Sequence, residues 1–299
     1  MKTWALLSFT ACGISLPLCG CGGGSAPAVP VAPAVSPLAG NWLIVGPMPA
    51  NGLVSSTGFR LALTFDVNGS NVTAAGFGND SCGNAESSFG FGSLATGTIA
   101  ADGSFTLQTP ANFPEGTISI QGTVPKASDS SWQGSYTVSF NAPLVPSTCD
   151  TTLTGTFTAT PFPLVSGVYG GTGSSQTVVN GVLTTTPLTF QVTLQQGGTV
   201  ATPIPGGTFT SKSVLAGSIR VQGSACFTSG VTGSRPVSAV EGNQVVAQFT
   251  MDDGSTLSIL GTLTDATETR ITTNVALVNG GQCGTVPYIF QLPELDRQS

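Results

Sequence analysis

Apolar and polar residues alternate in short stretches along most of the chain. Residues 59–67 place their odd-numbered side chains on one apolar face, and the same period of two occurs around Ile118 and Ile120 and at residues 190–194. A period of two is typical of half-buried β-strands. No segment keeps the 3.6-residue period of an amphipathic helix. The pattern therefore predicts an all-β protein.

Turn-forming pairs separate these stretches. They are Asn68-Gly69, Asp102-Gly103, Gly197-Gly198, Asp253-Gly254 and Asn279-Gly280. Gly and Asn tolerate positive φ, so such pairs suit tight hairpins between antiparallel strands. Many short strands joined in this way predict an up-and-down β-barrel, with a β-sandwich as the alternative.

The strand pattern occurs twice. Residues 116–124 (GTISIQGTV) match residues 255–263 (STLSILGTL), and Gly40-Asn41-Trp42 corresponds to Gly167-Val168-Tyr169. The offset between matched segments varies, as loop insertions between fixed strands would produce, and the period is that of a whole domain. We therefore predict two related β modules. The expected boundaries are 38–163 for the first module, 164–292 for the second and 293–299 for a C-terminal tail.

The N-terminus has a different pattern. Lys2 supplies one positive charge, and residues 3–18 are uncharged and rich in Leu, Ala, Phe and Ile. This order of a basic end and an apolar stretch is typical of a secretory signal. The apolar stretch is shorter than the roughly 20 residues that a spanning helix needs. We predict a cleaved signal peptide at residues 1–20.

The sequence Leu18-Cys19-Gly20-Cys21 resembles a bacterial lipobox, with Leu three positions before a cysteine and a small residue directly before it. The resemblance implies cleavage before Cys21, acylation of Cys21, and anchoring to a membrane through the lipid. Because Gly rather than Asp follows Cys21, it also implies sorting to the outer membrane of a Gram-negative cell. Cys19 is an alternative anchor, although bulky Leu18 precedes it. An ordinary signal with incidental cysteines is the other alternative.

A spacer follows the lipobox. After Cys21, residues 22–37 begin with Gly and Ser and continue with alternating Pro, Ala and Val. Such a composition forms a flexible start and then an extended segment, with nothing to build a core. We interpret residues 21–37 as a tether between the membrane and the folded modules.

Four further cysteines fall in the two modules. Export to an oxidising compartment favours disulfides, but four cysteines alone leave the connectivity open. The repeat matches Cys82 with Cys226 and Cys149 with Cys283, so we predict one bridge per module, Cys82–Cys149 and Cys226–Cys283. A zinc site is the alternative, and the absence of histidine and of C-x-x-C spacing argues against it.

The G-x-W sequence at Gly40 to Trp42 resembles the opening strand of the lipocalins and avidins. These families are up-and-down barrels with a ligand cup, so the resemblance implies a cavity. The second module has Tyr169 at the matching position and shows no further lipocalin signature. The alternative is that Trp42, Trp132 and Tyr169 close the β-core without contacting a ligand.

Charge is sparse. Asp, Glu, Lys and Arg make up 7% of the chain, against about 25% in an average soluble domain. The few basic residues form no cluster, which argues against a nucleic-acid partner. The chain has no histidine, which excludes the His-dependent catalytic arrangements, and it has no nucleophile elbow or P-loop.

These observations predict a membrane-anchored envelope lipoprotein with a non-enzymatic binding or structural role and with no cofactor or metal. The alternative is a carrier that holds an apolar or glycan ligand inside a barrel. A glycan hydrolase, with two carboxylates brought together in space, is the third hypothesis. A packed interior would favour the first hypothesis, an open aromatic cavity the second, and a cluster of acids in a cleft the third.

Overall fold

The computed structural model describes residues 35–46, 59–79, 89–110, 116–140, 152–197, 212–233, 238–264, 270–281 and 289–298. All regular structure in these segments is β-strand, which confirms the all-β prediction. Among the same residues, no helix is long and apolar enough to cross a membrane.

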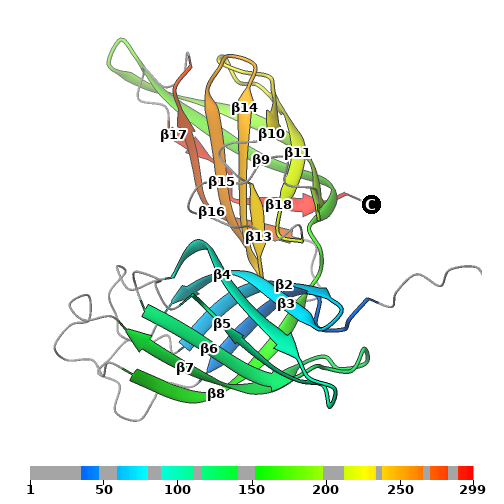
Figure 1. Cartoon of the computed structure of the whole chain (residues 1–299). Helices are drawn as coiled ribbons and strands as arrows, with labels where there is room; N and C mark the ends of the chain where they lie inside the picture. The colour runs from blue at the N-terminus through cyan, green and yellow to red at the C-terminus, as the bar shows by residue number, and fades with distance from the viewer. Residues whose placement is uncertain are drawn as a thin grey trace, which may run out of the picture. The chain divides into compact units, whose positions relative to one another are not determined.

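Eight antiparallel strands form the first barrel (Figure 1). They are β1 (Gly40–Gly46), β2 (Phe59–Asn68), β3 (Asn71–Asn79), β4 (Phe89–Ile99), β5 (Ser104–Gln108), β6 (Gly116–Thr123), β7 (Trp132–Phe140) and β8 (Thr152–Phe162). Each strand pairs with the next along the chain, and β1 pairs with β8 to close the sheet. The expected up-and-down barrel is confirmed, and the sandwich alternative is excluded.

The odd-numbered side chains of β2 share the core face, as the sequence predicts, but Ala62 and Thr64 on the other face are buried as well. Phe59, Leu61, Leu63 and Phe65 are all buried in the core of the first barrel. The following hairpin uses the predicted turn, and Gly69 has a φ of 61°. A side chain with a Cβ rarely adopts this backbone conformation, so glycine allows the tight reversal between β2 and β3.

The second barrel also closes on itself. Its eight consecutive strands are β9 (Ser166–Val179), β10 (Val182–Gln196), β11 (Leu215–Gln222), β12 (Ser229–Thr232), β14 (Gln244–Met251), β15 (Thr256–Leu263), β16 (Arg270–Asn279) and β18 (Glu294–Arg297). Pairing of β9 with both β10 and β18 completes the ring. Two short strands are added to it: β13 (Ala239–Glu241) pairs with β14, and β17 (Ile289–Gln291) pairs with β9.

The two barrels match strand by strand. The similar nine-residue segments of the sequence occupy β6 and β15, which are the sixth strand of their barrels. Gly40 and Gly167 open the first strands with φ values of 125° and 129°. Because only glycine adopts such values readily, both modules keep it there. The internal repeat therefore corresponds to a repeated barrel.

The prediction that residues 293–299 form a tail is wrong. These residues contain β18, which pairs with β16 and β9 and so closes the second barrel. Leu295 faces the core with a relative exposure of 1%. Outside the barrel, the Asp296 carboxylate lies 2.6 Å from Nε of Arg270 on the neighbouring strand. A strand of four residues with a single apolar side chain is too short to show a period, which is why the sequence pattern missed it.

We expect Leu295→Ala to lower the free energy of unfolding by about 2–5 kcal/mol, because it leaves a cavity in the core next to the closing strand. Leu277→Ala on β16 is the matched control, since Leu277 is 52% exposed. Urea unfolding of both variants measures the difference. An equal, small effect of the two substitutions would contradict the assignment of β18 to the barrel.

A pair of buried amides connects the two barrels. Asn41, on β1, donates from Nδ2 to Oε1 of Gln196, on β10, at 3.0 Å, and Gln196 donates from Nε2 to Oδ1 of Asn41 at 2.7 Å. The remaining amide hydrogens go to the carbonyl oxygens of Pro163 and Lys212. The backbone N–H of Val165 donates to Oε1 of Gln196 at 3.0 Å. Gln196 therefore uses its complete hydrogen-bonding capacity.

Thr64 extends this network to β13. Its hydroxyl lies 2.8 Å from Oδ1 of Asn41 and 2.8 Å from the carbonyl oxygen of Val240, and it accepts a hydrogen bond from the backbone N–H of Gly242 at 3.1 Å. A Cβ at position 242 would lie 2.4 Å from the carbonyl oxygen of Trp42. Only glycine permits this approach of the second barrel to the backbone of the first.

We expect Asn41→Leu and Gln196→Leu each to lower the free energy of unfolding by about 2–4 kcal/mol, because each leaves buried polar partners without hydrogen bonds. Gln195→Leu is the control, since its side chain lies at the neighbouring, exposed position of β10. Denaturant titration of the three variants would test this. Unchanged stability of the two network variants would show that the amide pair does not hold the barrels together.

Candidate functional site

Aromatic rings fill the first barrel near the start of β1 and β7. Trp132 makes edge-to-face contacts with Phe157, Phe105, Trp42 and Phe65, at centroid distances of 5.0, 5.5, 6.0 and 6.4 Å. Such contacts add roughly 0.5–1.5 kcal/mol each beyond the burial of area. The indole N–H of Trp132 has no acceptor among the described residues. Ring packing rather than a hydrogen bond therefore fixes this side chain.

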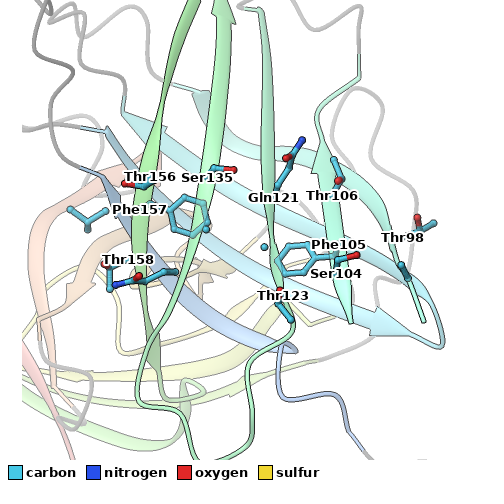
Figure 2. Close-up of a pocket in the computed structure, with 15 residues that line it drawn as sticks. Thr98, Ser104, Phe105, Thr106, Gln121, Thr123, Ser135, Thr156, Phe157 and Thr158 are labelled. Atoms are coloured by element: carbon cyan, nitrogen blue, oxygen red, sulfur yellow. The ribbon is translucent and has the colours of Figure 1, made fainter. Parts of the chain in front are cut away.

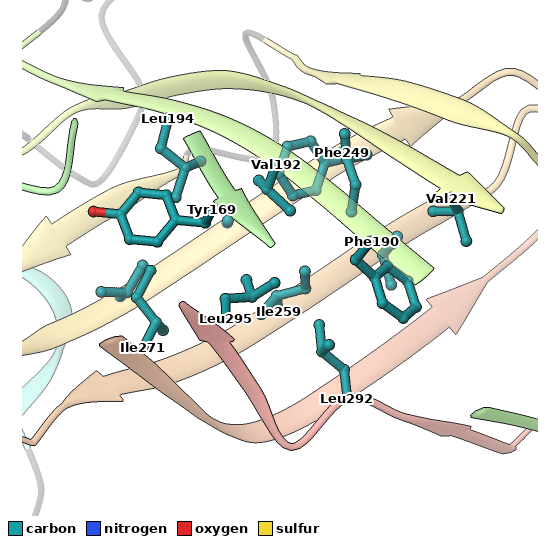
Figure 3. Close-up of a cluster of buried hydrophobic side chains, with 14 of the residues drawn as sticks. Tyr169, Phe190, Val192, Leu194, Val221, Phe249, Ile259, Ile271, Leu292 and Leu295 are labelled. Atoms are coloured by element: carbon teal, nitrogen blue, oxygen red, sulfur yellow. The ribbon is translucent and has the colours of Figure 1, made fainter. Parts of the chain in front are cut away.

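The other two aromatic residues singled out in the sequence are also in the cores. The indole N–H of Trp42 donates to the carbonyl oxygen of Leu38 at 2.9 Å. Tyr169 lies within the apolar cluster of the second barrel, among side chains such as Val192 and Leu295 (Figure 3). Burial raises the pKa of the Tyr169 hydroxyl. All three rings serve as packing groups in the described structure.

A groove of about 870 Å³ lies on the outer face of the first barrel, across β4 to β8 (Figure 2). The strand register places five exposed side chains directly opposite one another, one from each strand. They are Thr98, Thr106, Gln121, Ser135 and Thr156, and we call them the polar row. Neighbouring strands lie roughly 4.8 Å apart, so hydroxyl and amide groups repeat at that spacing along the groove.

Two glycines shape the wall beneath the groove. Gly122 on β6 pairs with Gly134 on β7. On their other sides, Gly122 pairs with Phe105 on β5, and Gly134 pairs with Phe157 on β8. A Cβ on Gly134 would lie 2.5 Å from the ring of Phe157, and one on Gly122 would lie 2.8 Å from the ring of Trp132. The rings take the space of the missing side chains, and glycines at such places allow a sheet to bend.

The groove is polar and uncharged. Besides the polar row, its hydroxyl and amide lining comes from Ser104, Thr123, Gln133 and Thr158. No Asp, Glu, Lys or Arg is among its lining residues in the described part of the chain. Asp102 lies beside the rim, where its carboxylate accepts a hydrogen bond from the Ser104 hydroxyl at 2.7 Å.

Sequence reasoning did not single out the polar row. Each member is an outward-facing residue in an alternating strand, and Ser and Thr are common at such positions throughout the chain. The sequence feature that could have indicated this site is Gly122 in the repeated segment, because a glycine within a strand often marks the close approach of another group. The neighbours across the sheet become visible only when the register is known.

The second barrel has a smaller groove of about 540 Å³ with a different lining. It includes Glu294 and Asp296 of β18. Both carboxylates face Nε of Arg270, at 3.6 and 2.6 Å. Both acids in this groove therefore form ion pairs with the same arginine.

Acidic residues elsewhere accept hydrogen bonds at turns. Asp252 lies after β14, and its carboxylate accepts hydrogen bonds from the Thr228 hydroxyl at 2.6 Å and from the Thr228 backbone N–H at 3.0 Å. These bonds, together with those from Ser229, lower the pKa of Asp252 below its usual 3.8. The described residues contain no group of three or more His, Cys, Asp or Glu side chains that could hold a metal ion.

The lowered pKa of Asp252 makes the stability of the protein depend on pH. A carboxyl with a depressed folded-state pKa stabilises the fold above its unfolded pKa, and this contribution is lost as pH falls below about 4. We expect Asp252→Asn to be less stable than the wild type at pH 7, and we expect this difference to be smaller at pH 2. Thermal unfolding at the two pH values measures this. The same stability difference at both pH values would contradict it.

Most of the cysteine predictions fall on residues outside the described part of the chain, namely Cys21, Cys82, Cys149 and Cys283. Cys226 lies between β11 and β12 and is disulfide-bonded. The predicted pairings Cys82–Cys149 and Cys226–Cys283 stay predictions, as does lipidation of Cys21.

No protein-family model matches this chain. No curated protein matches it either.

Proposed function

We propose that this protein is a lipid-anchored cell-envelope protein with a non-enzymatic binding or structural role. The observation that carries the proposal is the packing of both barrels. Large apolar and aromatic side chains occupy the two interiors, and Trp42, Trp132 and Tyr169 belong to these cores. Packed interiors support a role on the outer surface of the barrels more than a carrier role within them.

The lipobox and the tether support the anchoring. Acyl chains contribute about 0.8 kcal/mol per buried CH2 group, and two or more chains give stable attachment without a spanning helix. Residues 22–37 are rich in Gly and Pro and lead directly to Leu38, which is fully buried in the first barrel. The proposed lipid on Cys21 would therefore hold the barrels to a membrane through a short spacer.

Barrel topology supports the proposed disulfides. Cys82 and Cys226 fall between the third and fourth strands of their barrels, and Cys149 and Cys283 fall between the seventh and eighth. In an up-and-down barrel these two connections lie at the same end. We propose that each bridge ties two opposite connections together at one end of its barrel.

We expect Cys21→Ala to move the protein from the membrane fraction to the soluble fraction without changing its melting temperature, because the lipid site lies outside both cores. Cys19→Ala is the matched control and should stay in the membrane fraction. Fractionation with intact-mass analysis of the mature N-terminus measures both effects. Membrane retention of Cys21→Ala, or a wild-type N-terminus without lipid, would overturn the proposed anchor.

A further inference from the structure

We propose that the groove on the first barrel binds an extended, neutral polysaccharide chain along the polar row. This inference rests on the proposed surface role and names the ligand class and the site. The site is the outer face of β4 to β8, not the barrel interior that the lipocalin resemblance implied.

The lining chemistry matches a ligand that carries many hydroxyl groups. A Ser or Thr hydroxyl donates one hydrogen bond and accepts two, and the Gln121 amide both donates and accepts. A pyranose hydroxyl has the same mixed capacity, so either partner can donate at each contact. The polar row repeats such groups from Thr98 to Thr156 across five strands, which suits a linear chain with a repeating set of hydroxyls.

The charge of the groove excludes other ligand classes. An anionic polymer would find no Lys or Arg among the described lining residues, and the whole chain has a net charge of −6. A cationic ligand would find no carboxylate among the same described lining residues. An apolar ligand would have to strip water from nine exposed hydroxyl and amide side chains, which costs free energy without replacement hydrogen bonds.

The groove is also preorganised. Its side chains stand on paired strands of a closed barrel, above the rings of Phe105 and Phe157. Ser and Thr have short side chains, so they lose little rotamer freedom on binding. Its volume of about 870 Å³ falls within the roughly 300–1,000 Å³ of ligand sites.

The second barrel provides an internal comparison. The repeat aligns Gln121 of β6 with Leu260 of β15, and the Leu260 side chain is 36% exposed. The second barrel therefore presents an apolar side chain where the first presents an amide. Binding should belong to the first barrel alone.

The test is native electrophoresis of the mature full-length protein, in detergent, through gels containing hydroxyethyl cellulose, dextran or soluble starch. Alginate serves as the anionic comparison. We expect retardation by at least one neutral polymer, none by alginate, and no change between low and high salt, because no ion pair contributes. Gln121→Leu combined with Ser135→Arg should weaken binding by about tenfold or more.

Thr193→Arg, at an exposed position on β10, is the control and should bind as the wild type does. Equal melting temperatures of all variants show that the barrels remain folded. The proposal is overturned if no neutral polymer retards the protein, if alginate retards it more strongly, or if the groove variant binds normally. A negative result would not affect the proposed lipid anchor, because the fractionation of Cys21→Ala tests the anchor independently.

Discussion

Closure of each sheet on itself is the constraint on which the rest of this structure depends. An open sheet presents unpaired N–H and C=O groups at its edges, and proteins usually protect such edges with charged side chains. This chain has few charges to use, since they make up only 7% of its residues. Pairing of β1 with β8 and of β9 with β18 removes the open edges. Closure therefore allows barrels with largely uncharged outer faces.

The contact between the barrels depends on hydrogen bonds between buried polar side chains. Two amides and one hydroxyl are buried there, and burial of polar groups is unfavourable unless each is hydrogen-bonded. Asn41 and Gln196 satisfy each other and use backbone carbonyls for their remaining hydrogens. Because these bonds have fixed directions, they specify one arrangement of the contact, whereas apolar side chains alone would allow several.

The groove on the first barrel is likewise lined without charged side chains among the described residues. Bulky rings inside the first barrel occupy the space left by Gly122 and Gly134, and the wall outside them carries neutral groups, most of them polar. The contacts of these two glycines with the rings therefore connect the packing of the core with the shape of the surface. The second barrel keeps the fold of the first but differs at the outer positions, as Leu260 shows. Duplication could therefore preserve the core while the surfaces diverged.

The sequence by itself determined the class of the fold, the strands with clear alternation and the repeat. These features are local: a period of two fixes which side chains share a face, and glycine marks the turns that need positive φ. Only the tertiary structure decided that β18 belongs to the second barrel, that Asn41 meets Gln196, and that the polar row forms one line. Each of these depends on which strands become neighbours and in what register. Residues 155 positions apart, such as Asn41 and Gln196, leave no periodic signal of their contact in the chain.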